Sequence, residues 1–372
     1  TGTSRTSPTG STPATSTKET EKIISANNRM PLSEVDVVQS NNIALSIVVP
    51  AYNVQNTLTR LVESVLKSKH QNNLEVIVVN DGSSDSTLVL AQKLQEKHPK
   101  LIHVISTENG GHGYALSNGI RVAKGKYCRP VDGDDWLDSE GLDYFVEQIR
   151  SGVNADLLLS SFYKYNLANH KQELIRYNLP KTAFSINMLN EKNIYIGYHS
   201  ASYRTDILRR IPDFNKHCFY VDNEYIAYPI PMVHKILYLD TPLYVHSIGE
   251  GNQSTAMDNL IKNVENVQTV AKAILKYMQK ANCSNAQKEY MYRVTAKLLS
   301  LYGVICIYMG VKGKIRFNSI CRDLNMSYPE FLSAQHGSTK SFFNLYRRLN
   351  FRFYDGLVFV KRLQMKNRGI VW

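Results

Sequence analysis

The sequence predicts an α/β protein whose doubly wound, mostly parallel sheet is followed by a helical C-terminal extension. Short apolar runs typical of buried strands alternate with segments of helical periodicity over residues 45–131. A polar loop follows each of these runs, at the edge where such sheets bind ligands. Helical periodicity then dominates residues 256–325. With 372 residues, of which 43% are hydrophobic, the chain can form about two or three structural units.

The residues before the first strand do not favour a fold. Residues 1–20 are mostly Thr, Ser, Gly and Pro, a composition that buries too little apolar area to offset chain entropy. We therefore interpret residues 1–42 as a disordered tail or linker.

The first half of the ordered region, residues 43–150, is built from strand-helix-strand units. The run Leu45–Val49 is rich in β-branched residues and ends at Pro50, as expected for a buried strand. Further apolar runs and helical segments alternate after it, which gives parallel strands joined by right-handed crossovers. The predicted strands are 45–49, 74–79, 102–105 and 127–131, and the predicted helices are 55–68, 86–97 and 113–123.

Two further regions follow. Residues 151–255 contain shorter, aromatic-rich runs and one helical phrase at 203–210. Residues 256–372 form the helical extension, and their end is basic and aromatic.

An acidic loop follows the fourth predicted strand. Asp132, Asp134 and Asp135 place three carboxylates within four residues, although one carboxylate is enough to cap a helix. Close carboxylates repel one another unless a cation or hydrogen-bond donors balance them. Mg²⁺ and Mn²⁺ prefer oxygen ligands and commonly bridge carboxylates to substrate phosphates. The loop is therefore either a cation site for a nucleoside diphosphate or a set of capping residues.

Two other loops end at the same predicted edge. Ser84 and Asp85 are suited to cap a helix, which leaves Asp81 free to bind a base or ribose. The Gly-rich loop 108–113 opens a helix, so its amides, including that of Gly111, are suited to meet a phosphate. A P-loop sequence is absent, and no GxGxxG follows the first strand, which disfavours a dinucleotide cofactor.

Four sequence blocks together resemble the family 2 glycosyltransferases, which have the GT-A fold. The blocks are IVVPAYN at 47–53, VNDGSSD at 79–85, ENGGHGYALSNG at 108–119 and VDGDDWL at 131–137. The resemblance implies inverting transfer of a sugar from a UDP-sugar to an acceptor hydroxyl on a glycan or lipid-linked saccharide, of the kind used in bacterial surface polysaccharide or glycoconjugate assembly. It makes residues 43–150 the nucleotide-sugar-binding half and residues 151–255 the acceptor-binding half.

The same resemblance assigns the donor site. It places Ala51, Tyr52 and Asp81 on the uridine, with Asn53 and Asp85 nearby. The full donor-binding set that it predicts is Pro50, Ala51, Tyr52, Asn53, Asp81, Asp85, Gly111, Asp132, Gly133 and Asp134.

The resemblance also implies a metal-assisted reaction. Asp134 and Asp132 are the metal ligands that it implies: Asp134 is expected to bind Mn²⁺ or Mg²⁺ through the diphosphate, with Asp132 directed toward the ribose and Asp135 in support. His246 is a further candidate metal ligand, although a lone His in an apolar run is more often a core side chain.

An inverting displacement needs a base that accepts the proton of the acceptor hydroxyl. The family carries this base as the Asp of a Glu-Asp pair, and Asp222 matches that place, although Val221 stands where the Glu is usual. Asp222 is the predicted base and Glu224 the second candidate, whereas the alternative is that Asp222 caps a helix. The candidate acceptor-binding residues are Trp136, Asp135, His199 and Arg204.

The basic end of the chain suggests a location. Residues 341–372 contain seven Lys or Arg and one acid, a net +6 of the chain's +12, interleaved with aromatic residues. Such a segment suits an anionic membrane surface, and an ordinary packed helix is the alternative. Because no RNA-binding signature accompanies it, we do not expect nucleic acid as a partner.

The sequence shows no apolar run of about 18 residues and no signal-peptide pattern. Its five cysteines are odd in number and lack CxxC spacing, which argues against a disulfide framework and a zinc site. We therefore expect a cytoplasmic protein, peripheral on the inner face of the plasma membrane.

Two other functions remain open. A nucleotidyltransferase that makes the sugar nucleotide shares the sheet and the cation, but it should have a Gly-rich basic loop where residues 50–53 are PAYN. An inactive glycosyltransferase-like scaffold is favoured by Val221 and disfavoured by the intact acidic loop.

Overall fold

The computed structural model describes residues 43–249, 257–333 and 356. The predicted tail, residues 1–42, lies outside the described residues, as does the basic segment, residues 341–372, apart from Gly356. The sheet and helices described below belong to one compact unit, Ser40–Trp372.

Parallel strands form the first half of the sheet, in the order β3-β2-β1-β4. The strands are β1 Leu45–Ala51, β2 Leu74–Asp81, β3 Ile102–Thr107 and β4 Tyr127–Pro130, and the helices between them are α2 Leu58–Leu66, η1 Gln71–Asn73, α3 Thr87–Lys97 and α4 His112–Val122. The predicted strands and helices of this half are confirmed. Every residue of β1 and β2 is buried, because helices cover both faces of the sheet, which explains their continuous apolar runs.

The second half adds strands that run in both directions. β8 (Ala201–Arg204) pairs antiparallel with β4, and β6 (Leu157–Asn166) pairs antiparallel with β8. These two reversals make β6 parallel to β4, and β9 (Ile236–Ile248) is parallel to β6. β9 therefore ends, and β8 begins, at the carboxyl edge of β4. Two short strands, β5 (Trp136–Leu137) on β9 and β7 (Gln172–Ile175) on β6, complete the nine-stranded sheet of the described residues.

The predicted helix at 203–210 is wrong for its first part. Tyr203 and Arg204 belong to β8, and the helix that follows is only α7, Thr205–Leu208. Tyr203 is fully buried and pairs with both β4 and β6, so strand pairing outweighs the local helical pattern.

The remaining helices lie around the sheet and in the C-terminal extension. They are α5 Ser139–Arg150, α6 Ile186–Glu191, η2 Tyr198–Ser200, α8 Asp222–Ala227, η3 Ile230–Met232, α9 Met257–Lys262, α10 Val264–Lys280, α11 Asn285–Tyr308, α12 Val311–Ser327 and α13 Pro329–Ser333. The helical character predicted for residues 256–325 is confirmed for its described part. No helix among the described residues combines the length and the apolar composition that crossing a membrane requires.

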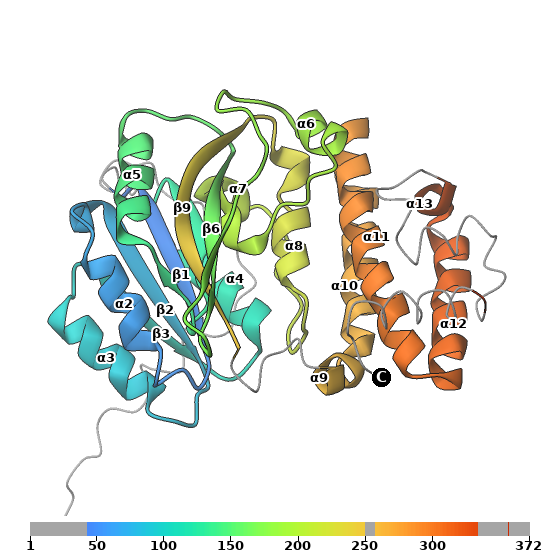
Figure 1. Ribbon diagram of the computed structural model, residues 1–372, viewed down its shortest axis with the longest axis horizontal. Coiled ribbons are helices and arrows are strands. Elements are labelled where there is room, and N and C mark those ends of the chain that lie inside the picture. The colour runs from blue at the N-terminus through green and yellow to red at the C-terminus, as the bar shows by residue number, and fades with distance from the viewer. Residues whose placement is uncertain (1–42, 250–256, 334–355, 357–372) are drawn as a thin grey trace, which may run out of the picture. The chain divides into compact units, whose positions relative to one another are not determined.

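Two hydrophobic cores lie on opposite faces of the sheet. Alternate residues of β1 point to different cores: Ile47 packs with α2, α3 and α5, whereas Val48 packs with α4. The core that contains Val48 continues through Tyr225 of α8 to Val267 and Tyr290 of the extension. Figure 1 shows α8 between the sheet and the α10–α11 pair. The extension therefore shares a core with the sheet.

Candidate active site

Asn53 ties the loop after β1 to the loop after β2. Its side-chain oxygen accepts from the backbone N–H of Ser84 at 2.9 Å and of Asp85 at 3.4 Å, while its own N–H donates to Ser83 Oγ at 3.1 Å. Its φ of 54° is one that Asn adopts more readily than most residues. Asp85 also accepts from the N–H of Thr87 at 2.9 Å, at the start of α3. Asn53 and Asp85, both predicted to bind the UDP-sugar, thus hold the backbone of these two loops in place.

Asp81 joins the loop after β2 to the Gly-rich loop after β3. Its two carboxylate oxygens accept from the N–H groups of Gly110 and Gly111, each at 2.8 Å. The expectation that Asp81 is left free and that the Gly111 amide meets a phosphate is therefore wrong, because these groups bind each other. Each carboxylate oxygen has a second lone pair, so Asp81 keeps acceptor capacity toward a nucleoside.

The acidic loop is attached to the loop after β1. Thr57 Oγ1 donates to the Gly133 carbonyl at 2.7 Å, and Arg60 donates to the Asp134 carbonyl at 2.5 Å. A Cβ on Gly133 would lie 3.0 Å from the side chain of Val54, so the two loops approach closely. The loops after β1, β2, β3 and β4 therefore meet at one edge, as the sequence predicted.

The other residues predicted in this region differ in how far solvent reaches them and in what they pack against. Pro50 and Ala51 are buried within β1, whereas Tyr52 is 52% exposed. The ring of Trp136 has the Arg60 guanidinium 4.2 Å from its centroid and Tyr165 at its edge, with ring centroids 5.2 Å apart. Trp136 is thus packed by protein groups on at least one face.

Residues of β9 donate hydrogen bonds to the acidic loop. Asp135, only 1% exposed, accepts from Tyr244 Oη and from the Ser247 N–H, each at 2.6 Å. Tyr244 Oη also accepts from the Asp132 N–H at 3.1 Å, and Ser247 Oγ donates to the Asp134 carbonyl at 3.1 Å. Because β9 ends at the carboxyl edge of β4, its last residues reach this loop.

Tyr198 and His112 also contact Asp132. Tyr198 Oη donates to Asp132 Oδ1 at 3.3 Å, and His112 Nε2 lies 3.1 Å from Tyr198 Oη and 3.9 Å from Asp132 Oδ1. Burial raises the pKa of Tyr198 well above its usual value, so its hydroxyl stays protonated and can donate. Tyr198 lies in η2, directly before β8, and the antiparallel direction of β8 puts it at this edge.

Burial and mutual repulsion favour protonation of the acidic loop. Burial raises the pKa of Asp132 to about 7, and the charge of Asp134 contributes to that rise. Burial also raises the pKa of Asp135 well above its usual value, with further contributions from Asp132 and Asp134. A divalent cation would compete with these protons and stabilise the ionised loop.

Two sets of side chains in the described part of the chain could hold a divalent cation. One set is Asp132, Asp134 and Asp135, the other is Asp135, His199 and His246, and within each set the ligand atoms lie within 4.8 Å of one another. Since Asp135 already accepts two short hydrogen bonds, Asp132 and Asp134 are the better oxygen ligands.

The two histidines differ in what surrounds them. His246 Nδ1 is buried and has no hydrogen-bond partner among the described residues, so this nitrogen is available to a ligand. His199 stacks on His246, with ring centroids 4.2 Å apart, and burial lowers the pKa of His199 well below its usual value. The residues therefore fit a divalent cation, but the predicted ligands Asp132, Asp134 and His246 are divided between the two sets.

Asp222 lies at the same edge. It is exposed and begins α8, which packs against η2, and the turn before it is held to the Gly-rich loop by a bond from the His217 N–H to the Gly110 carbonyl at 2.7 Å. Crowding by protein atoms raises the pKa of Asp222, although solvent reaches the side chain, and the charges of His112 and Lys297 oppose that rise. The alternative that Asp222 occupies the cap of this helix is wrong, because Val221 does.

Glu224 cannot serve as the second candidate base. Its side chain is fully buried and accepts from the Asn215 N–H at 3.0 Å and from Asn215 Nδ2. Glu224 therefore anchors the turn before Asp222, out of reach of an acceptor.

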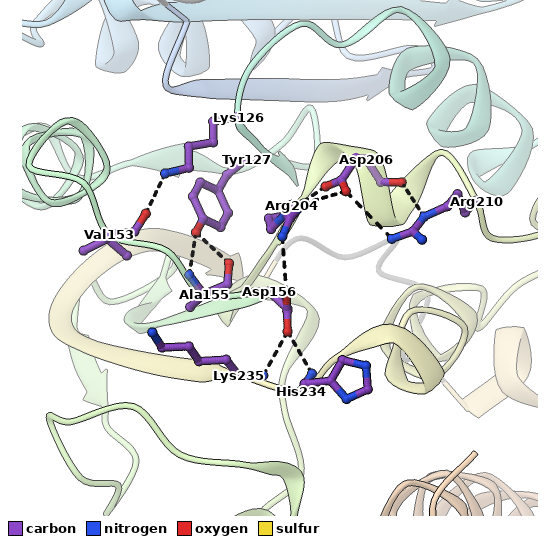
Figure 2. Close-up of polar contacts among 10 residues, drawn as sticks. All are labelled: Lys126, Tyr127, Val153, Ala155, Asp156, Arg204, Asp206, Arg210, His234 and Lys235. Atoms are coloured by element: carbon purple, nitrogen blue, oxygen red, sulfur yellow. Dashed lines mark hydrogen bonds and ion pairs between the residues drawn. The ribbon is translucent and has the colours of Figure 1, made fainter. Parts of the chain in front are cut away.

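The predicted role of Arg204 at the acceptor site is wrong. Arg204 ends β8 opposite Tyr127, the first residue of β4, and so lies at the amino edge of the sheet. Figure 2 shows its guanidinium between Asp206, which accepts at 2.9 and 2.7 Å, and Asp156, whose carboxylate lies 3.5 Å away. The residues before β8 reach the site, whereas those at its end do not.

Sequence reasoning missed three side chains at this edge. His112 lies inside one of the matched blocks and Tyr198 precedes the predicted His199, so both had a local signal. Lys297 had none within a motif, but it is exposed although every other residue of 290–299 is buried. This exposure follows from how α11 packs, so the sequence alone held no signal for Lys297.

Comparison with known proteins shows which family part of this chain resembles. Residues 46–211 match the family described as Glycosyl transferase family 2. Glycosyltransferase GlyG of Streptococcus pneumoniae is 34% identical over 124 residues, which are 33% of this chain and 40% of that protein. Poly(ribitol-phosphate) beta-N-acetylglucosaminyltransferase TarS of Staphylococcus aureus is 29% identical over 168 residues, which are 44% of this chain and 28% of that protein. The matches thus span less than half the length of these relatives.

Solved structures share the fold over most of the chain. The crystal structure of S. aureus TarS 1-349 in complex with UDP-GlcNAc has a TM-score of 0.63 and 19% identity, and the likeness covers 89% of this chain and 93% of that one. TarS 1-349 in complex with UDP has a TM-score of 0.60 and 18% identity, with coverage of 88% and 92%. The expected GT-A fold, with helices after the sheet, is confirmed.

The raised pKa of Asp132 predicts how an uncharged variant responds to pH. Between the unfolded pKa of a carboxylate and about 7, the folded protein binds more protons at Asp132 than the unfolded one does, so this residue's contribution to stability falls as pH rises. In chelator, Asp132→Asn should therefore melt at least about 2 °C above the parent protein at pH 8. The difference should shrink below pH 6.

Thermal melts of both proteins from pH 5.5 to pH 8 measure this difference. Adding Mn²⁺ should raise the melting temperature of the parent more at pH 8 than at pH 5.5, because protons compete for the same oxygens. A variant that is less stable than the parent by the same margin at every pH would contradict the account of Asp132.

Proposed function

We propose that this chain, whose residues 46–211 match glycosyl transferase family 2, catalyses the inverting transfer of a sugar from a UDP-sugar to an acceptor hydroxyl. The observation that carries the proposal is that the acidic loop and Asp222 lie at one edge of the sheet. His112 Nε2 lies 3.9 Å from Asp132 Oδ1, and the charge of His112 also acts on Asp222. Support for a UDP-sugar comes from TarS, whose structures of the same fold hold UDP-GlcNAc or UDP.

In the proposed reaction Asp222 is the base. Its carboxylate accepts the proton of the acceptor hydroxyl as that oxygen forms a bond to the anomeric carbon. The bond from the anomeric carbon to the diphosphate breaks on the opposite face, and UDP leaves with the bonding electrons. The proton on Asp222 then passes to solvent, which reaches this side chain.

Mn²⁺ or Mg²⁺ held by Asp132 and Asp134 would offset the negative charge on the departing diphosphate. Tyr244, Ser247 and Tyr198 hold the loop in place by donating hydrogen bonds to its carboxylates and carbonyl. Tyr244 and Ser247 come from the long strand β9 and Tyr198 comes from η2, so the loop is held from two parts of the chain.

The acceptor and the location are proposals of the same kind. We expect the acceptor to be a glycan or a lipid-linked saccharide, as in assembly of bacterial surface polysaccharides or glycoconjugates.

Residues 341–372, which lie largely outside the described residues, would bring the enzyme to an anionic membrane surface. The intact chain should then float with liposomes that contain anionic lipid, and a chain without 341–372 should not. Equal flotation of both would reject this segment as the anchor.

The sugar donor is identified by UDP release from a panel of nucleotide sugars, including UDP-GlcNAc, with Mn²⁺, Mg²⁺ or chelator.

Asp222→Asn should lower turnover by about 10²–10⁴-fold while UDP binding, measured by calorimetry, is retained. Asp213→Asn, which alters a carboxylate 66% exposed on the same segment, is the matched control and should leave turnover unchanged. Unchanged turnover in Asp222→Asn would reject the base, and no release from any donor would favour a scaffold.

The charge of Lys297 predicts a change in the pH dependence of the rate. Lys297 lowers the pKa of Asp222, and the base acts only when ionised. Lys297→Met should therefore shift the acidic limb of the kcat profile to higher pH. Lys276→Met, which removes an exposed charge from the neighbouring helix α10, should leave the profile in place. Identical shifts in both variants would show that the effect is one of net charge alone.

A further inference from the structure

We propose that Arg293, on α11 of the helical extension, is a positioning residue that holds Tyr198 against Asp132. The extension would then be part of the active site. This inference rests on the proposed transfer reaction, because it gives Tyr198 a role beside the donor-binding carboxylate.

The segment that carries Tyr198 has little structure of its own. Residues 192–197, between α6 and η2, form neither helix nor strand, so the segment relies on other elements to fix its path. Arg293 supplies several contacts. One terminal nitrogen donates to the Leu189 carbonyl at 2.8 Å and to Asn190 Oδ1 at 2.9 Å, and the other donates to Asn193 Oδ1 at 2.8 Å.

The same face of α11 holds the next residues of the segment. Tyr290, one turn before Arg293, accepts from the Ile196 N–H at 2.9 Å. The Tyr195 ring has the Arg293 guanidinium 4.8 Å and the Lys297 ammonium 5.0 Å from its centroid. Positions three and four apart on a helix face the same way, so three side chains of α11 fix this segment from one side.

The held segment leads directly to the site. After Ile196, the Gly197 N–H donates to Tyr177 Oη at 2.9 Å, and the next residue is Tyr198. Tyr198 Oη then donates to Asp132 Oδ1 at 3.3 Å. Only a few residues therefore separate the contacts of Arg293 from the acidic loop. A shift of the segment would move the Tyr198 hydroxyl away from Asp132.

The burial of Arg293 is difficult to explain by stability alone. Its side chain is 1% exposed, and no ion pair of Arg293 with a carboxylate occurs within the described ranges. Burying a guanidinium without an opposite charge is costly, and an apolar side chain of similar volume often serves stability as well. Several fixed acceptors around one planar group instead specify a single path for the segment.

Gln287 offers a matched control on the same helix. It is 3% exposed, and its Nε2 donates to the carbonyls of Ile230 at 2.9 Å and Val233 at 3.1 Å. Like Arg293, it is a buried side chain of α11 that binds backbone carbonyls of the sheet domain. The carbonyls that it binds lie around η3, however, and its Oε1 accepts from the Ser284 N–H at the start of α11, so none of these partners lies in the segment before Tyr198. Loss of Gln287 therefore reports the cost of loosening α11 without moving Tyr198.

The experiment is a double-mutant cycle on UDP release by the full chain. Arg293→Met and Tyr198→Phe should each lower kcat by at least about tenfold, because a displaced group at the reacting centre costs that much or more. The double variant should be no slower than the slower single variant, since Arg293 acts through the Tyr198 hydroxyl. Gln287→Met should lower the melting temperature yet leave kcat within about twofold of the parent, and its effect should multiply with that of Tyr198→Phe.

Multiplicative losses for Arg293→Met and Tyr198→Phe, or a kcat for Arg293→Met equal to that of Gln287→Met, would overturn the inference. If Arg293→Met does not fold, Tyr290→Phe replaces it in the cycle, because it removes only the hydrogen bond from the Ile196 N–H. The kcat of its double variant with Tyr198→Phe is then compared with those of the single variants in the same way. A parent protein that releases no UDP from any donor would overturn the proposed function, whereas an active parent with uncoupled variants overturns the positioning role alone.

Discussion

The close spacing of Asp132, Asp134 and Asp135 at the end of β4 is the constraint on which the rest of the site depends. Three carboxylates on one short loop repel one another and lose water, so their ionised forms are unfavourable unless donors or a cation balance them. The protein provides the donors from distant parts of the chain: Tyr244 and Ser247 from β9, and Tyr198 from η2. These donors do not neutralise the negative charge of the three carboxylates, and a divalent cation would do so.

The direction of each strand decides which residues can take part. β9 is parallel to β4 and so brings its last residues to the acidic loop, whereas antiparallel β8 brings the residues before its first one. This is why His199 lies at the site and Arg204 at the opposite edge, although only five positions separate them in the sequence. The extension shares a core with this mixed part of the sheet, so its helices can reach the segment that carries Tyr198.

Local pattern was enough to predict the parallel half of the fold and the acidic loop. The strands β1 to β4 appear as apolar runs, and the loop follows the last of them directly. The pairing of Asp81 with the Gly110 and Gly111 amides was not predictable, since each group alone looked suited to a ligand. The places of Lys297 and Arg293 were not predictable either, because they depend on how a helix far along the chain packs against an irregular segment. Local pattern misassigned residues 203–204 for the same reason, that their partners are remote.

The central claim is that the acidic loop and Asp222 face each other across a bound nucleotide sugar with its cation. The most direct measurement is a crystal structure with UDP and Mn²⁺, with the cation located by its anomalous scattering. The account predicts one strong anomalous peak within bonding distance of Asp134, with the diphosphate beside it and the uracil near Tyr52 and Asp81. The Asp222 carboxylate should lie on the open side of the diphosphate, where a sugar and its acceptor would bind. A cation or nucleotide bound away from this loop, with Asp132 and Asp134 unchanged, would contradict the account.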